Sequence, residues 1–404
     1  MENKFSEVAA VLHLPHWPPQ PDLIFWIALT LVLAALLGEF AQRLQLPRLL
    51  GYGAMGMVMS ALGHSLADGG LRGTDRLMVD LALAVLLFEL GSRVSLHWLR
   101  VNKLLWVASL AESAASFGAI FVVLRSFDFD AQEALAGSCV LGAAAGALAG
   151  RMAAETHSAG QVTERMIVFS ALNLLYAVLL FKLVGGGLSL GRAGDWGEGV
   201  AQPLYTFAGA VLLAALLARA VEWVLRRSGL REENSALLVL GLLLLALSLA
   251  RALALSTLLV PLMAGVLLRN RSPRPCIWPR HFGTAGGVLV LLLFVLVGAA
   301  WSWKAMVLGG VAAAALLVTR FLAKAVVLVG LARVSGIEAK QGLALAFTLS
   351  PVSATALVLL ADLQRTLPDL AQRIAPVVLA ATGLMVLLGP ILVLAGLRMA
   401  KEHT

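Results

Sequence analysis

Four polar side chains that could bind an ion or carry a proton lie inside long apolar segments of this sequence. Glu112 lies near the middle of WVASLAESAASFGAIF, and Asn173 is the one strongly polar residue of VFSALNLLYAVLLF. Arg320 and Lys324 are four residues apart in LLVTRFLAKAVVLVG, so they share one face of a helix. A carboxylate binds cations and protons, and a lysine shielded from water can release its proton near neutral pH. Glu112 is therefore expected either to pair with Arg320 or Lys324 or to be the working carboxylate itself.

A proline with hydroxyl neighbours interrupts another apolar segment, LAFTLSPVSATALVLL. Pro351 has no backbone N–H and therefore frees a carbonyl upstream. Thr348, Ser350 and Ser353 carry hydroxyls close to it. These hydroxyls could either satisfy the interrupted backbone or face a ligand, and the sequence leaves both interpretations open.

The segments that hold these residues indicate a polytopic membrane protein of the all-α class. Of the 404 residues 60% are hydrophobic and 13% are charged, whereas soluble domains are about 45–50% apolar and about 25% charged. A membrane helix needs roughly 20 apolar residues. Thirteen spans are expected near 22–42, 48–66, 77–92, 101–124, 132–150, 164–184, 200–224, 233–250, 255–268, 282–299, 304–331, 338–361 and 374–397.

The placement of basic residues predicts the orientation. With the N-terminus outside, the segments on the inner side hold more than half of the 31 Lys and Arg residues, as the positive-inside rule requires. The C-terminus should therefore lie in the cytoplasm. Because no targeting segment is apparent, we expect the protein to be in a bacterial inner membrane. Residues 1–21 would be an extracytoplasmic segment, 22–398 one transmembrane domain, and 399–404 a short tail.

Other functional classes find little support in the sequence. The net charge of +8 follows from the basic loops, so we expect no nucleic-acid partner. Cys139 and Cys276 do not form a disulfide framework, and the histidines are scattered, so neither a metal site nor a cofactor is expected. No nucleophile–base arrangement or phosphate loop is apparent, which disfavours an enzyme.

Five apolar segments match the patterns of one protein family in order. They read QRLQLPRLLGYGAMGMVM, LAVLLFELGSRVSLHWLR, LSLARALALSTLLVPLMAGVLLRN, LLLFVLVGAAWSW and AATGLMVLLGPILV. Together they resemble the monovalent cation:proton antiporter family, of the Kef type with a sodium/proton exchanger transmembrane domain. The resemblance extends over most of the chain.

The resemblance implies a fold of inverted repeats in which two broken helices cross near the membrane centre. The core helices would lie within 101–184 and 304–398, and the remaining helices would form a scaffold. Freed backbone groups and half-helix dipoles at such a crossing can meet an ion. The family implies exchange of sodium or potassium for protons, by an elevator-type movement of the core in a homodimer within the lipid bilayer.

The chain departs from the family at the ion-binding position. The family's sixth helix carries an Asp–Asp or Asn–Asp pair, whereas here Asn173 is followed by Leu174. Leucine can neither bind a cation nor carry a proton. Lys324 aligns with the basic residue that neighbours the family's carboxylate, so this part of the site is retained.

Both expected broken helices also depart from the family pattern. The fifth helix, LGAAAGALAGRM, has Gly142, Gly146 and Gly150 but lacks the family's Ser-Pro. Small residues at this spacing favour a close packing face over a break. In the twelfth helix Ser350-Pro351 is present, but the charged pair that often follows the proline is absent.

Three functions are compatible with these features. The first, which the broad resemblance favours, is cation:proton antiport at an altered site that uses Lys324, Glu112 and the carbonyls of the crossing. The second is transport of a small anion by Arg320 and Lys324 in the same fold. The third is a relative that does not transport. A common fold alone does not decide among them.

Overall fold

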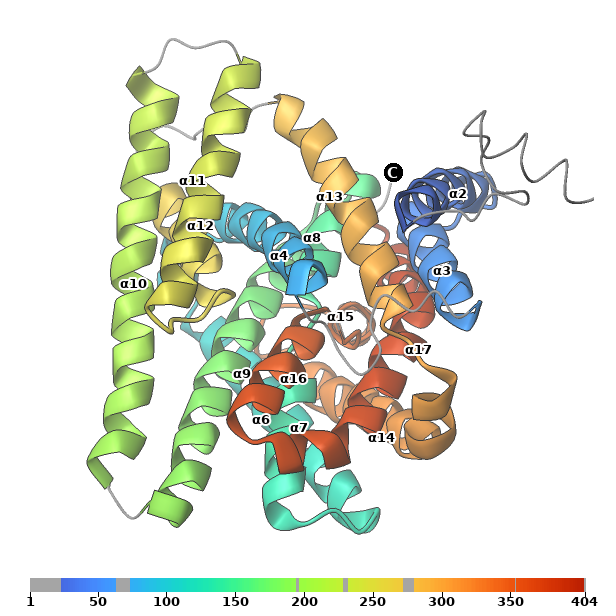
Figure 1. Cartoon of the computed structure of the whole chain (residues 1–404), viewed down its shortest axis with the longest axis vertical. Helices are drawn as coiled ribbons and strands as arrows, with labels where there is room; N and C mark the ends of the chain where they lie inside the picture. The colour runs from blue at the N-terminus through green and yellow to red at the C-terminus, as the bar shows by residue number, and fades with distance from the viewer. Residues whose placement is uncertain are drawn as a thin grey trace, which may run out of the picture.

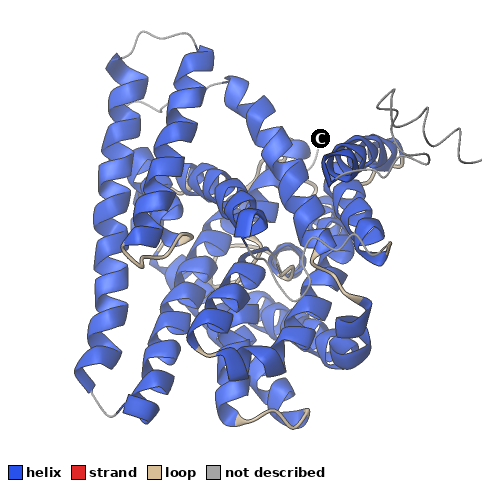
Figure 2. Cartoon of the chain, viewed as in Figure 1, coloured by secondary structure: helices blue, strands red, loops and turns tan. Residues whose placement is uncertain are grey.

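The computed structural model describes residues 23–62, 73–193, 196–227, 232–271, 280–352 and 354–402. Throughout these residues the regular secondary structure is helical (Figure 2), so the all-α class is confirmed. The expected segment 1–21 and Ser353 lie outside the described residues. The helices are α2 Leu23–Arg43, α3 Arg48–Ala61, α4 Gly73–Arg93, α5 Leu96–Val101, α6 Lys103–Ser126, α7 Ala131–Gly142, α8 Gly146–Glu155, α9 Gln161–Ala193, α10 Trp196–Arg227, α11 Glu232–Ala252, α12 Leu259–Arg271, α13 Arg280–Ala299, α14 Trp303–Gly330, α15 Ala339–Leu349, α16 Ala354–Thr366 and α17 Pro368–Ala400 (Figure 1).

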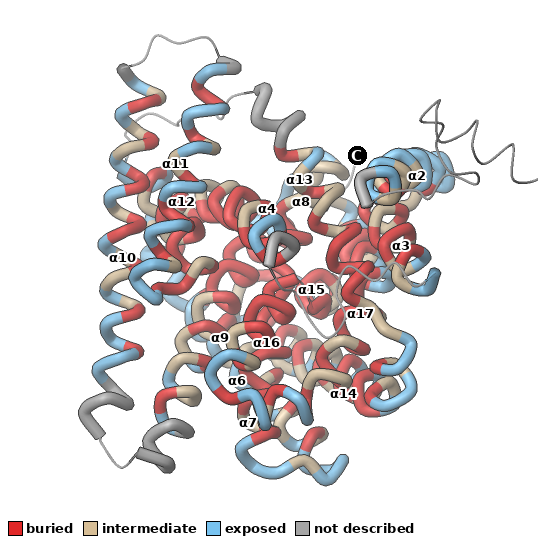
Figure 3. The backbone as a smooth tube through the Cα atoms, viewed as in Figure 1, coloured by how far each residue is buried: buried red, intermediate tan, exposed pale blue. Residues whose placement is uncertain are grey.

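Each of the thirteen expected spans contains a helix or a pair of helices. Eight described segments are long and apolar enough to cross a membrane, or up to nine if the bent pair α15 and α16 is one span. The polytopic class is therefore confirmed, while the number thirteen stays a prediction. Figure 3 shows many exposed residues along α2 and α10. Large apolar side chains are among them, such as Leu36 and Phe40 on α2 and Leu212 and Leu216 on α10, as expected of lipid-facing residues.

Two helix breaks meet in the interior. α7 ends at Gly142 and α8 begins at Gly146, while α15 ends at Leu349 and α16 begins at Ala354. The backbone N–H of Ala145 donates to the carbonyl of Pro351 (3.1 Å), which joins the two interruptions directly. α15 packs against α9, α14 and α17 near the middle of the molecule (Figure 1). The expected crossing of broken helices is therefore present.

The break between α7 and α8 corrects one expectation from the sequence. The glycine spacing predicted a packing face rather than an interruption, yet Ala143 has an extended backbone (φ −62°, ψ 128°). Close packing is present as well, because a Cβ added to Gly146 would lie 2.8 Å from the side chain of Leu90. The prediction was wrong because contacts from distant residues, described below, replace the helical hydrogen bonds that the break removes.

Glycines bring the helices outside this crossing into backbone contact. A Cβ on Gly56 of α3 would lie 2.1 Å from the carbonyl oxygen of Val295, and one on Gly298 of α13 would lie 2.2 Å from that of Gly53. Between α4 and α12, Gly91 and Gly265 show the same close approach. Small residues at helix interfaces allow such close packing, which matters in a membrane because no hydrophobic driving force brings helices together in lipid.

The two sets of helices around the breaks share one order. The first set is the long helix α6, the broken pair α7 and α8, and the long helix α9. The second set is the long helix α14, the broken pair α15 and α16, and the long helix α17. α14 packs on α6 and α17, so the polar residues of both sets can meet beside the crossing.

Candidate functional site

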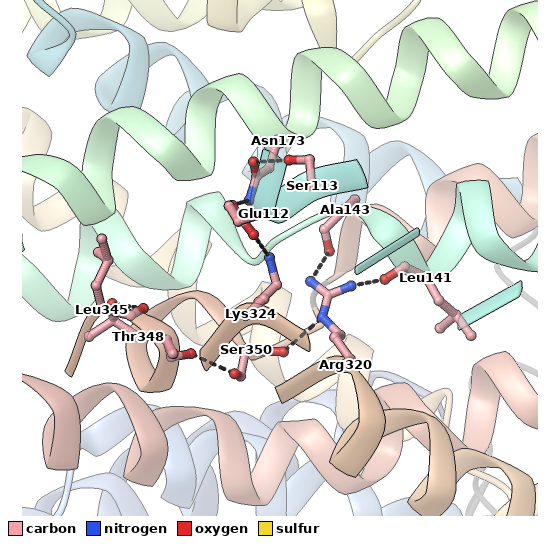
Figure 4. A network of polar contacts seen from close by, with 11 residues as sticks. Glu112, Ser113, Leu141, Ala143, Asn173, Arg320, Lys324, Leu345, Thr348 and Ser350 are labelled. Carbon is pink, nitrogen blue, oxygen red and sulfur yellow. Dashed lines mark hydrogen bonds and ion pairs between the residues drawn. The ribbon is translucent and has the colours of Figure 1, made fainter. Parts of the chain in front are cut away.

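A carboxylate, an amide and an ammonium group meet beside the crossing (Figure 4). Asn173 of α9 donates its Nδ2–H to Oε1 of Glu112 on α6 (2.6 Å). Lys324 of α14 forms an ion pair with Oε2 of the same carboxylate and donates a hydrogen bond to it. The hydroxyl of Ser113 donates to Oδ1 of Asn173 (2.5 Å). Both carboxylate oxygens of Glu112 therefore have a donor.

This group is shut off from solvent. The exposed fraction is 0% for Glu112, 0% for Lys324 and 2% for Asn173. Taking two opposite charges out of water is costly, and the pair persists only because the geometry and further hydrogen bonds compensate. Of the two partners expected for Glu112, the structure selects Lys324. A buried pair of this kind can bind a cation or transfer a proton when one partner moves away.

Arg320 connects the ends of two half-helices. Its Nη1 donates to the carbonyl of Leu141, its Nη2 to that of Ala143 (3.2 Å) and its Nε to that of Ser350 (3.2 Å). These carbonyls lie at the C-terminal ends of α7 and α15, where the helix dipole is negative. A guanidinium has five N–H donors in a fixed plane, which lets one side chain serve both ends. Arg320 is 1% exposed and thus stabilises the crossing rather than facing solvent.

The hydroxyls around the proline satisfy their own backbone. Thr348 donates to the carbonyl of Leu345 (2.9 Å), and Ser350 donates to that of Ala346 (2.6 Å). Of the two interpretations left open by the sequence, this arrangement favours backbone repair at both residues. The carbonyl of Pro351 accepts the N–H of Ala145.

Some features of the site were not expected. Ser113 was not among the expected site residues, although its position next to Glu112 was a signal. The hydroxyls of Ser116 on α6 and Ser170 on α9 are buried without a hydrogen-bond partner in the described part of the chain. Ser116 lies one turn after Glu112 and Ser170 nearly one turn before Asn173, so both share the faces of the site residues. Leu174 is fully buried.

The residues that the structure describes contain no group of three or more His, Cys, Asp or Glu side chains that could hold a metal ion. The site instead consists of one carboxylate, one amide, one ammonium and nearby hydroxyls.

Comparisons with known proteins agree with this architecture. The model of the family described as sodium/hydrogen exchanger, transmembrane, matches residues 28–394. A structure of the sodium proton antiporter MjNhaP1 from Methanocaldococcus jannaschii at pH 8 superposes with a TM-score of 0.67 at 16% identity, covering 93% of this chain and 95% of that one. An electron-microscopy structure of the same antiporter gives a TM-score of 0.70 at 15% identity, with coverage of 94% and 98%. No curated protein matches the sequence.

Proposed function

Because the chain belongs to the sodium/hydrogen exchanger transmembrane family, we propose that it is a membrane transporter that exchanges a monovalent cation for protons at an altered site. Glu112 takes the role of the aspartate that the family carries where this chain has Leu174. The observation that carries this proposal is the buried carboxylate of Glu112, which Asn173 and Lys324 hold beside the crossing. Its family and structural neighbours are transporters and not enzymes.

The ion pair of Glu112 and Lys324 suggests how exchange works. A cation that binds the Glu112 carboxylate competes with the Lys324 ammonium for the same oxygens. A buried ammonium without its counterion is unfavourable, so Lys324 releases its proton when the cation arrives. Protonation of Lys324 on the other side restores the pair and expels the cation. In each step one positive charge replaces another, and the buried site never carries an uncompensated charge.

Buried hydroxyls about one helical turn from Glu112 and Asn173 support a cation site rather than a proton site alone. A cation that leaves water needs oxygen ligands in place of its hydration shell. Ser116 and Ser170 have buried hydroxyls without partners in the described chain, and such groups call for a water or an ion. The amide oxygen of Asn173, which accepts the hydroxyl of Ser113, is a further oxygen of the site.

The alternative of an anion transporter is less well supported. It requires Arg320 and Lys324 to offer free positive charge, but Lys324 is paired with Glu112. Arg320 donates to three backbone carbonyls. A relative that does not transport at all is best distinguished by a flux measurement.

Cation-driven proton flux is the expected behaviour of the purified protein in liposomes. When a pH gradient with an acidic liposome interior is imposed, adding sodium or potassium to the outside should dissipate it, because each cation that enters drives a proton out. A pH-sensitive dye measures the dissipation, and comparing the two salts identifies the preferred ion. Protein-free liposomes control for leakage, and exchanging the anion at constant cation should change nothing. A pH gradient that neither salt disturbs would rule out the exchange function.

An elevator-type movement is part of the proposal. The core would comprise residues 101–184 and 304–398 and the scaffold the remaining helices, in a homodimer with the N-terminus outside and the C-terminus in the cytoplasm of a bacterial cell. In support, an ion pair joins the two parts at the side predicted to face outward. Arg76 of α4, in the proposed scaffold, pairs with Asp362 of α16, in the proposed core. This contact would have to separate if the core moved.

Fixing this contact should stop transport. We expect the variant with Arg76→Cys and Asp362→Cys to lose proton flux when a short bifunctional maleimide joins the two cysteines, because the core can then no longer move against the scaffold. The matched control joins Glu133→Cys on α7 and Arg373→Cys on α17, an ion pair at 3.0 Å within the proposed core. Flux that survives cross-linking of Arg76→Cys to Asp362→Cys would contradict the elevator movement.

A further inference from the structure

An open cleft lies between α8 and the helices α2, α3 and α13. Its volume is about 540 Å³. Arg151 and Glu155 of α8 line it together with His157, which follows that helix. Arg48 and Tyr52 of α3 line the opposite wall. The cleft therefore lies at the boundary between the proposed scaffold and the half-helix that starts at the crossing.

Three hydrogen-bond donors that line the cleft lack a partner among the described residues. They are the guanidinium of Arg151, the hydroxyl of Tyr52 and the imidazole of His157. The guanidinium of Arg151 lies beside Gly287 of α13, since a Cβ added there would be in ordinary contact with Nη2 of Arg151 at 3.9 Å. Arg151 is only partly exposed, so bulk water does not fully solvate it. Donors that line one cleft without a partner suit a ligand that is rich in acceptors.

The described charged groups of the cleft leave one guanidinium group without an ion pair. Two guanidinium groups, Arg48 and Arg151, face one carboxylate among its described lining residues, that of Glu155. Oε1 of Glu155 accepts the backbone N–H of Arg48 (2.8 Å). Glu39 pairs with the Arg48 side chain at 3.5 Å, whereas Arg151 forms no ion pair among the described residues. Its guanidinium is therefore available to attract an anion.

We propose that this cleft binds a phosphate group, carried by a lipid headgroup or by a soluble phosphate. Guanidinium groups bind phosphate through two parallel hydrogen bonds, and the hydroxyl of Tyr52 and the imidazole of His157 supply further donors. The cleft opens on the side predicted to be cytoplasmic, where membranes carry anionic lipids. Val288 of α13, which also lines the cleft, is 57% exposed and offers an apolar surface to an acyl chain.

A ligand in the cleft would connect α8 to α3 and α13. It would thereby hinder movement of the crossing relative to the scaffold and slow exchange. This regulatory consequence rests on the proposed function, whereas the binding itself does not.

The test measures binding and flux separately on the full chain. The protein is placed in phosphatidylcholine nanodiscs and titrated with inorganic phosphate, and in a second arm the nanodiscs contain phosphatidic acid. Bound ligand stabilises the folded protein by RT ln(1 + L/Kd), where L is the free ligand concentration, so Tm rises with ligand concentration once this exceeds Kd. We expect such a rise in at least one arm, and Arg151→Gln should weaken binding about tenfold or more because a charged hydrogen-bond donor is lost. Arg333→Gln, an exposed arginine away from the cleft, is the matched control and should bind as the native protein does.

The two arms identify the source of the phosphate group. A rise with inorganic phosphate supports a soluble ligand, and a rise with phosphatidic acid supports a lipid headgroup. No rise in either arm, or equal binding by Arg151→Gln, overturns the proposal. If Arg151→Gln proves unstable without ligand, Tyr52→Phe removes a single hydroxyl and must weaken binding severalfold. Binding in a protein that shows no flux would contradict the proposed function alone.

Discussion

Replacing Glu112 with glutamine is expected to abolish cation-driven proton flux and to destabilise the protein. The amide cannot hold a cation, and it leaves the buried ammonium of Lys324 without a counterion. Removing one partner of a buried ion pair costs about 3–5 kcal/mol in the free energy of unfolding. Thermal unfolding of the purified variant measures the stability, and the pH-gradient assay in liposomes measures the flux.

A second variant separates the two effects. Combining Glu112→Gln with Lys324→Met removes both charges, so most of the lost stability should return because no unpaired charge stays buried. Flux should remain absent, since neither the cation ligand nor the proton carrier is left. If this double variant exchanged cations for protons as the native protein does, Glu112 would be a structural residue and the ion site would lie elsewhere.

Replacing Arg320 with methionine is expected to have an effect of similar size on the crossing. The three carbonyls of Leu141, Ala143 and Ser350 would lose their donor in apolar surroundings. Hydrogen bonds to charged groups contribute about 1.5–3 kcal/mol each, and the losses overlap because the three share one donor group. We expect a decrease of about 4 kcal/mol in the free energy of unfolding, measured by thermal unfolding, together with loss of transport.

Arg320→Lys tests whether geometry or charge is decisive. A lysine keeps the positive charge at the negative helix ends but lacks the planar guanidinium that spans both of them. Its stability should lie between those of the native protein and Arg320→Met. Arg333→Gln, at an exposed position, should change stability by less than about 0.5 kcal/mol. If the Arg320→Met variant had the same unfolding temperature as the native protein, Arg320 would not hold the two half-helices together.

Much of this architecture could be predicted from the sequence. The length and composition of the apolar segments predicted a polytopic helical protein, and each expected span contains a helix. Pro351 predicted the break between α15 and α16, because proline removes a donor wherever it occurs. Glu112, Asn173 and Lys324 were expected at the site because charged or strongly polar groups within a membrane segment need a partner.

Other parts of the site could not be predicted. The segment between Gly142 and Gly146 contains only alanines, which favour helix, so its local propensity argues against the observed break. The pairing of Glu112 with Lys324 rather than Arg320 joins residues 212 positions apart. Arg320 and Lys324 lie one helical turn apart on the same face, so the periodicity of the sequence cannot tell which of them pairs with Glu112.

By itself, the sequence thus determined the class of protein, the helical spans, the proline break and the polar residues that must find partners. These follow from local composition, because apolar length and a missing N–H act wherever they occur along the chain. Only the tertiary structure decided that α7 breaks before α8, that Arg320 serves the ends of two half-helices, and that Glu112 selects Lys324. Each of these depends on which distant groups come within hydrogen-bonding distance, and inside a membrane such groups must replace the water that the backbone and the charges have lost.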